Sequence, residues 1–193
     1  MKPASFEIEN CGDIPQTARL VSDTVLAGGV VLYPSDTVYG LMCRADSREA
    51  VDRVHRIKGY KKRRPFILLV DGTDMACRLA RCNDPEIQAI MKSRWPGKLT
   101  LLLPIRDRCP EWVASDDGFI ALRHPDHRLS ELILERCGIP LVSTSANTAG
   151  EMHNTDFDEI PPEVRDSVDL TVNAGKLPPS SPSTIIRLIR GRG

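Results

Sequence analysis

Short apolar runs constrain the fold of this chain more than any other feature of its sequence. Runs at 30–33, 66–70, 99–103 and 139–142 are bounded by polar or turn-forming residues. Each is too short for a buried helix and carries branched side chains, so each predicts a buried strand. The longest run, 99–105, is far below the roughly 20 residues of a membrane span. We therefore expect a sheet protein without a membrane segment.

Amphipathic segments lie between these runs. Residues 16–27 place Ala18, Val21 and Val25 on one face, and Gly28 with Gly29 ends the predicted helix. Further helices are predicted from Ser47 onward and over 74–80, 85–94 and 129–137. Further strands are predicted over 118–123, 168–172 and 183–189.

The order of these elements is irregular, which favours a three-layer α/β (α+β) arrangement with a mixed sheet over regular βαβ winding. The chain has 193 residues, of which 41% are hydrophobic. That size supplies one good core, so we expect residues 1–193 to form a single domain.

Composition excludes several classes of protein. The 26 basic and 26 acidic residues cancel, which argues against bulk non-specific binding of nucleic acid. Six cysteines contain no CxxC pair and four histidines no HExxH pattern, so we expect no metal site in the protein itself. The N-terminus lacks an apolar signal core, and unpaired cysteines are typical of a reduced, cytoplasmic protein.

A polar loop directly follows the first buried strand. Residues 34–40, PSDTVYG, hold Ser35, Asp36, Thr37 and Tyr39 together. Loops at strand ends commonly bind ligands. A hairpin turn with its tyrosine packed on the sheet edge is the alternative interpretation.

A basic segment, residues 53–64, has seven Lys and Arg and no acid. Such a cluster in a neutral protein suits a polyanion such as a triphosphate or RNA, unless it is simply a solvated face. Lys58 followed by Gly59 is typical of phosphate binding, because glycine lets backbone amides approach a ligand closely. Neither a P-loop nor a Rossmann fingerprint occurs.

Two further places carry candidate polar groups. Arg123 ends a predicted strand, where its guanidinium could clamp a carboxylate or form an ordinary surface ion pair. Residues 141–150, LVSTSANTAG, and 181–184, SPST, concentrate hydroxyls beside strands. Without a Ser–His–Asp or Cys–His signature, they favour hydrogen-bonding cradles over nucleophiles.

Taken in order, these segments resemble the YrdC-like family of threonylcarbamoyl-AMP synthases. The resemblance covers about residues 14 to 190. The matching motifs are 34–41 PSDTVYGL, Lys58 with 65–70 PFILLV, 96–101 PGKLTL, 123–125 RHP, 145–150 SANTAG and 183–184 ST.

The resemblance implies a YrdC-like fold, a strongly twisted mixed sheet of about seven strands flanked by helices, in the short form without an extra C-terminal domain. It implies synthesis of threonylcarbamoyl-adenylate from L-threonine, bicarbonate and ATP, with release of pyrophosphate and Mg²⁺ bridging the phosphates. A partner complex would then transfer the threonylcarbamoyl group to an adenosine of the tRNA anticodon loop.

The resemblance also implies roles for individual residues. The catalytic pair is Lys58 and Arg123. The ATP-binding set is Lys58, Arg63, Arg64, Ser145, Asn147 and Arg190. The threonine-binding set is Ser35, Thr37, Tyr39, Arg123, Ser143 and Ser183.

The chain departs from the family pattern at four positions. Tyr60 stands where the family has the arginine of K-x-R, and Leu69, Lys98 and His153 replace other usual residues. Two alternatives therefore stay open, a YciO-like paralogue with weak or altered activity and an RNA-binding module. The retained TVYG and SAN motifs favour the synthase, and Tyr60 alone in the basic segment could stack on a base, so only weak RNA binding is expected.

Overall fold

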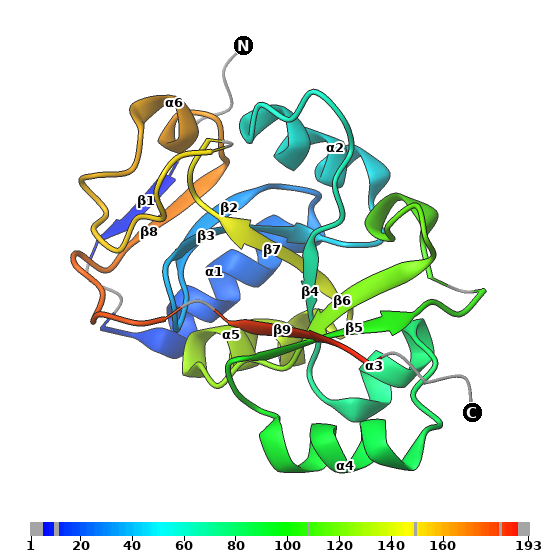
Figure 1. The fold of residues 1–193 in the computed structure, drawn as a ribbon. Coiled ribbons are helices and arrows are strands. Elements are labelled where there is room, and N and C mark those ends of the chain that lie inside the picture. The colour runs from blue at the N-terminus through cyan, green and yellow to red at the C-terminus, as the bar shows by residue number, and fades with distance from the viewer. Residues whose placement is uncertain (1–5, 10–11, 108, 149, 182, 189–193) are drawn as a thin grey trace.

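Nine strands form one mixed sheet in the computed structural model, which describes residues 6–9, 12–107, 109–148, 150–181 and 183–188 (Figure 1). The strands stand in the order β1-β8-β2-β3-β7-β4-β6-β5-β9. They are β1 (Phe6–Glu9), β2 (Val31–Pro34), β3 (Tyr39–Arg44), β4 (Ile67–Leu69), β5 (Leu99–Pro104), β6 (Phe119–Arg123), β7 (Leu141–Ser145), β8 (Leu170–Asn173) and β9 (Thr184–Arg187).

The sheet is mixed because it contains both parallel and antiparallel strand pairs. β1 and β2 both run parallel to β8, β4 runs parallel to β6, and β9 runs parallel to β5. The pairs β2–β3, β3–β7, β7–β4 and β6–β5 are antiparallel. The predicted mixed α/β architecture is therefore confirmed, and Figure 1 shows the strands twisting progressively across the sheet.

Two strands of the sheet are not predicted from the sequence, which indicates about seven. β1 is a short edge strand that alternates apolar and acidic residues. β3 begins at Tyr39, inside the segment interpreted as a ligand loop, and pairs with β2 across the turn so that Pro34 faces Tyr39. The hairpin alternative is therefore correct for residues 31–44, and only its turn is left as a loop.

Every predicted helix is present, with side-chain caps at several ends. The helices are α1 (Ile14–Leu26), α2 (Arg48–Ile57), α3 (Thr73–Leu79), α4 (Pro85–Arg94), α5 (Arg128–Cys137) and α6 (Pro162–Arg165), with a 3₁₀ turn at Glu111–Val113. The side chains of Asp13, Ser47 and Asp84 accept backbone N–H bonds at the starts of α1, α2 and α4. Such caps satisfy amides that have no partner within the helix. α5 ends at Gly138, whose φ of 64° is left-handed.

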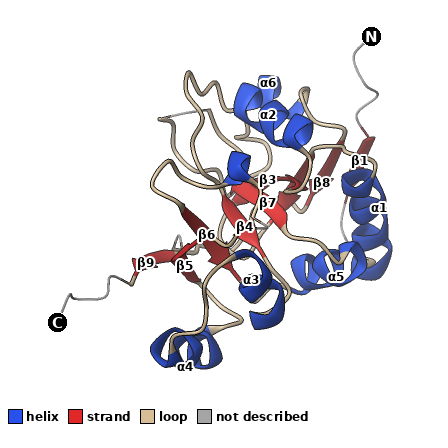
Figure 2. Ribbon diagram, turned by 90° about the vertical axis from the view of Figure 1, so that its right-hand side faces the viewer, coloured by secondary structure: helices blue, strands red, loops and turns tan. Residues whose placement is uncertain are grey.

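Helices cover both faces of the sheet. α1 and α5 pack together on one face, through residues such as Val21 and Ile133 (Figure 2). α2, α3 and α4 contribute Val54, Met75 and Met91 to the larger core on the other face. Buried strand residues alternate between the two cores, as the two-residue period of a strand requires. Within the described ranges, no helix has the length and apolar character needed to cross a bilayer.

Candidate active site

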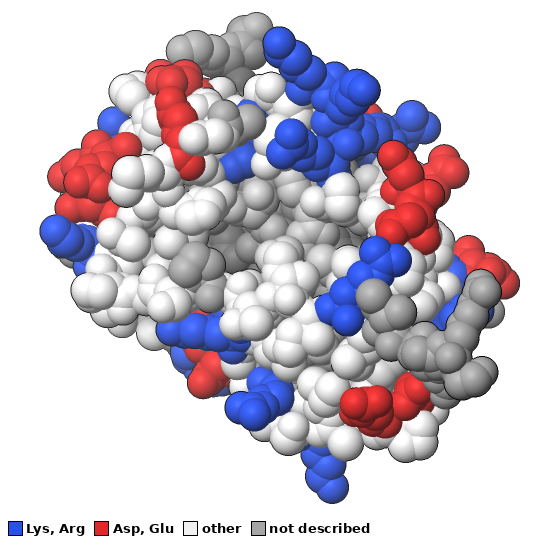
Figure 3. All heavy atoms as spheres, viewed as in Figure 1, with Lys and Arg blue, Asp and Glu red and all other residues white. Residues whose placement is uncertain are grey.

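A cavity of about 260 Å³ opens where the polar ends of β2, β6 and β7 meet. In Figure 3 it is the hollow near the centre of the molecule, with Lys and Arg side chains gathered above it. Segments more than 100 residues apart in the chain contribute to its wall. The predicted site residues that line it are Ser35, Thr37, Arg64, Arg123, Ser143, Ser145 and Ser183.

The turn between β2 and β3 is held by its own serine. The hydroxyl of Ser35 donates to the carbonyl of Val38 at 2.6 Å and accepts the backbone N–H groups of Thr37 and Val38 at 3.1 and 3.2 Å. It also lies 3.0 Å from the hydroxyl of Thr37. These bonds fix the turn without a ligand, so the cavity wall here is preorganised.

Arg123 forms a buried ion pair with Asp36. Its Nη2 lies 2.5 Å from Oδ2 of Asp36, with the two side chains only 7% and 11% exposed. Its Nε donates to the carbonyl of Gly97 at 3.0 Å. Among the described residues, no hydrogen-bond partner is found for Nη1. The guanidinium is thus held from two sides, and its remaining N–H groups are available to an anion in the cavity.

β7 presents alternate hydroxyls to the cavity from the middle of the sheet. Ser143 pairs in register with Met42 and Ser145 with Gly40. The hydroxyls of Ser143 and Tyr33 lie 2.9 Å apart. Burial raises the pKa of Tyr33 to about 12 although this hydrogen bond opposes the shift, so the phenol stays protonated near neutral pH.

Lys58 lies behind this wall rather than in it. It is the C-cap residue of α2 and is only 2% exposed. Its Nζ donates to the carbonyl of Ser145 at 2.7 Å, to the Ser145 hydroxyl at 3.3 Å and to Oδ1 of Asn147 at 2.7 Å. Burial lowers the pKa of this ammonium group to about 8. Lys58 therefore holds the SAN loop (residues 145–147) in place and puts a positive charge beneath it.

Asn147 also points its side chain into the loop. Its Oδ1 accepts from Lys58 and from the Ser145 hydroxyl, and its Nδ2 donates to the carbonyl of Glu151 at 2.7 Å. The residue is 4% exposed and lies outside the cavity wall. The predicted contact of Asn147 with phosphate stays a prediction. In the structure, the hydrogen bonds of Asn147 shape the loop that carries Ser145.

The lower rim is closed by the segment before β9. The hydroxyls of Ser183 and Thr100 lie 3.0 Å apart. Lys98 donates to the hydroxyl of Ser180 at 2.7 Å, and that hydroxyl donates to the backbone carbonyl of Asp36 at 3.0 Å. Lys98, one of the departures from the family pattern, thus ties the segment before β9, at Ser180, to the β2–β3 turn.

Two further predicted site residues, Tyr39 and Arg63, lie away from the cavity wall. Tyr39 is fully buried and donates its hydroxyl to the carbonyl of Gly175 at 2.8 Å, so its assignment to threonine binding is wrong. It belongs to the opposite face of β3 from Gly40, which lines the cavity. Arg63 pairs with Asp52 at 2.5 Å and is not part of the cavity wall. Arg190 lies outside the described residues.

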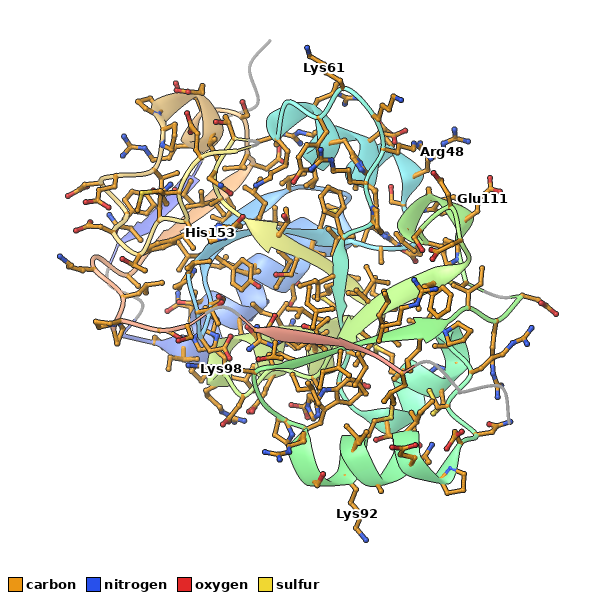
Figure 4. The ribbon with its side chains drawn as sticks, viewed as in Figure 1. Arg48, Lys61, Lys92, Lys98, Glu111 and His153 are labelled. Carbon is orange, nitrogen blue, oxygen red and sulfur yellow. The ribbon has the colours of Figure 1, made fainter. Side chains whose placement is uncertain are left out.

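The structure adds residues to the cavity wall that the predicted catalytic and binding sets leave out. Asp36 orients Arg123 through their ion pair. In the sequence, Asp36 is distinguished only as the acidic residue among the hydroxyl-bearing residues of the turn. Tyr33 and Ser130 also line the cavity. The sequence predicts only that Tyr33 lies in a strand and Ser130 in a helix. His153, a departure from the family pattern, also lines the cavity, from the loop after β7 (Figure 4).

These features define an α/β protein with a polar cavity at the strand ends of its sheet, into which a buried, ion-paired arginine projects. Residues 23–193 match the sequence model of the Sua5/YciO/YrdC family, described as telomere recombination. The chain therefore belongs to the Sua5/YciO/YrdC family.

Curated relatives agree with this assignment. The chain is 33% identical to a threonylcarbamoyl-AMP synthase of Marinobacter nauticus over 90% of this chain and 92% of that protein. It is 32% identical to a threonylcarbamoyl-AMP synthase of Coxiella burnetii over 83% and 86% of the two chains. These relatives support the synthase interpretation rather than the paralogue or the RNA-binding module.

Solved structures share the fold. P. abyssi Sua5 complexed with L-threonine superposes with a TM-score of 0.85 at 25% identity, covering 96% of this chain and 54% of that one. The present chain thus spans about half the length of that Sua5. E. coli YciO superposes with a TM-score of 0.83 at 26% identity, covering 96% and 90% of the two chains.

Proposed function

We infer that this protein synthesises L-threonylcarbamoyl-adenylate from L-threonine, bicarbonate and ATP, with release of pyrophosphate. It is thus a nucleotidyltransferase that supplies the activated group for threonylcarbamoyladenosine in the tRNA anticodon loop. The observation that carries this proposal is the convergence of five separate sequence motifs on one cavity wall, in a chain whose curated relatives are threonylcarbamoyl-AMP synthases.

The reaction requires two bonds to form. The amine of threonine attacks the carbon of bicarbonate, and loss of water gives a carbamate. A carbamate oxygen then attacks the α-phosphorus of ATP, and the bond to pyrophosphate breaks. Negative charge accumulates around phosphorus and on the leaving group, so the protein contributes positioning and positive charge rather than a nucleophile.

The threonine side of the proposed site is the Arg123 end of the cavity. The guanidinium, held by Asp36 and Gly97, would take the threonine carboxylate with its remaining N–H groups. The hydroxyls of Ser35, Thr37, Ser143 and Ser183 would hydrogen-bond the rest of the amino acid. Because Asp36 already neutralises Arg123, the paired arginine avoids the cost of an isolated buried charge before substrate arrives.

The ATP side is the SAN loop and the cation beneath it. Ser145 lines the cavity, and Lys58 and Asn147 hold its backbone and hydroxyl in one arrangement. A fixed loop with a buried ammonium behind it suits a phosphate chain, since the charge acts across a short path of low dielectric.

We propose that Mg²⁺ enters with ATP. Among the described residues, no three His, Cys, Asp or Glu side chains gather as a metal site, and the carboxylate in the cavity, Asp36, is paired with Arg123. This donor set suits a magnesium ion held mainly by phosphate oxygens and water, which would neutralise charge on the phosphate chain.

The remaining partners also belong to the proposal. Bicarbonate would be the third substrate, and a separate threonylcarbamoyl-transferase complex would carry the product to tRNA. We place this activity in the cytoplasm, where ATP and tRNA are available.

Pyrophosphate release tests the function. Purified protein with Mg-ATP and bicarbonate should release pyrophosphate only when L-threonine is added, and the threonylcarbamoyl-adenylate should be identified by mass spectrometry. A folded protein that shows no dependence on threonine would contradict the proposal.

Arg123→Lys tests the threonine side. This variant keeps the charge opposite Asp36 but loses the planar fork, so the threonine KM should rise roughly tenfold while the ATP KM changes little. Arg128→Lys, at an exposed site on α5, is the control that should behave like the parent protein. An unchanged threonine KM in a folded Arg123→Lys variant would show the carboxylate assignment to be wrong.

A further inference from the structure

The seven cations of the basic segment have different surroundings. Arg53 pairs with Asp169 at 2.5 Å, and Arg63 pairs with Asp52 at the same distance. Lys58 is bound to the SAN loop. The exposed cations outside the cavity wall, apart from the paired Arg63, are Arg56, Lys61 and Lys62. Of these, Lys61 projects away from the hollow (Figure 4). Most of this charge is therefore neutralised or directed away from the cavity.

Arg64 is the member of the basic segment that lines the cavity with its charge available. It is exposed at the cavity mouth and forms no ion pair with any described residue. Arg123, the other arginine in the wall, is already neutralised by Asp36. Arg64 therefore presents an uncompensated guanidinium to a ligand that enters from this side.

An aromatic ring holds that guanidinium. Its Cζ lies 5.1 Å from the centre of the Tyr60 ring, within the range of a cation–π contact. The ammonium group of Lys58 lies 5.9 Å from the same ring centre. The Tyr60 ring thus lies close to both the buried cation of the SAN loop and the exposed cation of the mouth.

The backbone of Arg64 is fixed as well. Nε2 of His55 lies 3.2 Å from the backbone nitrogen of Arg64 and 2.9 Å from its carbonyl oxygen, while Nδ1 faces the carbonyl of Val51 at 3.0 Å. The His55 ring packs on Phe66 at 4.4 Å and on Tyr60 at 6.1 Å between centroids. The loop of the basic segment is thereby anchored on both sides of Arg64, its last cation.

We propose that Arg64, positioned by the ring of Tyr60, binds the leaving pyrophosphate part of the ATP phosphate chain. This inference rests on the proposed function. The reacting α-phosphate would lie close to the buried threonine end at Arg123, so the rest of the chain extends toward the mouth, where Arg64 lies. A guanidinium suits two phosphate oxygens at once, and a ring that holds it beforehand lowers the entropy lost on binding.

Tyr60 thereby has a role at the position where the family pattern has an arginine. The ring carries no charge itself but holds the arginine four residues later at the cavity. Tyr60 is a positioning residue, and Arg64 supplies the charge.

Calorimetric binding of ATP and of AMP, without threonine, tests the assignment on the whole chain. Arg64→Gln should weaken ATP roughly tenfold or more, as expected for a lost charge-assisted contact, and leave AMP within about twofold. Arg56→Gln removes an equal charge from the same segment outside the cavity and should leave both affinities unchanged. Equal losses in these two variants, or equal losses for ATP and AMP with Arg64→Gln, would overturn the proposal.

Variants at Tyr60 test the positioning. Tyr60→Phe keeps the ring and should retain the parent affinity for ATP, whereas Tyr60→Ala should lose roughly two- to fivefold. The double variant Tyr60→Arg with Arg64→Gln returns a guanidinium to the same mouth and should recover most of the affinity lost in Arg64→Gln. Loss in Tyr60→Phe as large as in Tyr60→Ala would contradict a role for the ring.

The same variants separate this inference from the proposed function. In the pyrophosphate assay, Arg64→Gln should raise the ATP KM and leave the threonine KM unchanged. If the parent protein binds ATP through Arg64 but releases no pyrophosphate with threonine, the function fails and the phosphate assignment stands. If the parent protein is active and Arg64→Gln has the parent KM for ATP, the assignment fails and the function stands.

Discussion

At the scale of single residues, the site depends on polar groups that are already satisfied by the protein. The Lys58 ammonium donates to three acceptors of the SAN loop, and Ser35 makes four contacts within its own turn. Such internally bonded groups keep their geometry before substrate arrives, so less reorganisation is needed when charge develops. The sequence locates both residues, but their partners become visible only in the structure.

The charge of Lys58 predicts an alkaline limit to ATP binding. Burial lowers its pKa to about 8, so the ammonium is charged below that pH and loses its proton above it. The ATP affinity measured by calorimetry without threonine should therefore fall as pH rises from 8 to 9.5. The fall should approach tenfold per pH unit if binding requires the charge of Lys58. A constant affinity over this range would contradict the assignment.

Unfolding does not explain such a loss. Because the folded pKa of Lys58 lies below that of a free lysine, the unfolded chain binds this proton more tightly between about pH 8 and 10.4. The contribution of Lys58 to the free energy of unfolding therefore rises with pH across that window. Circular dichroism at each pH provides the control.

At the scale of elements, α2 links stability to the site. Its first turn is capped by Ser47, its middle packs Val51 and Val54 into the core, and its C-cap is Lys58. His55, from its last turn, contacts the backbone of Arg64. α2 therefore supports Lys58 directly and the backbone of Arg64 through His55.

Ser47→Ala should lower the free energy of unfolding by about 1 kcal/mol, because the N–H of Ala50 loses its side-chain acceptor. Urea unfolding followed by circular dichroism measures the change as a lower midpoint with the same slope. Ser47→Asp keeps an acceptor and should unfold near the parent midpoint. Equal losses in both variants would show that the cap bond is not the cause.

The β2–β3 hairpin shows where pattern analysis of elements fails. Pro34 lacks a backbone N–H, and the polar residues after it have the composition of a loop. The strand nevertheless resumes at Tyr39, because β7 pairs with β3 on its other side over residues 40–44. A neighbour about 100 residues away in the chain, and not local propensity, decides this strand.

At the scale of the whole molecule, the sheet order brings distant motifs together. β7 lies between β3 and β4, so Ser143 and Ser145 line one cavity together with the turn after β2 and the segment before β4. Tyr39 links this region to the far part of the sheet, since its hydroxyl donates to Gly175 and accepts the backbone N–H of Ala174. The start of β3 is thus tied to the segment that follows β8.

Tyr39→Phe should lower the free energy of unfolding by about 1–3 kcal/mol, because a buried donor and acceptor lose their partner. The threonine KM should stay at the parent value, since the ring faces away from the cavity. Chemical unfolding and the pyrophosphate assay give the two measurements. A raised threonine KM without a loss of stability would restore Tyr39 to the binding site.

The sequence by itself determined helices α1 to α5, most strands, the mixed α/β architecture and the polar segments that form the cavity, but not the short helix α6. These depend on local periodicity, caps and residue type, which act over a few neighbouring positions. Only the tertiary structure decided that Asp36 pairs with Arg123, that Tyr39 is buried, and that Arg64 rather than Arg63 faces the cavity. The physical reason is that adjacent residues on a strand or loop point in different directions, and long-range strand pairing sets which of them meet.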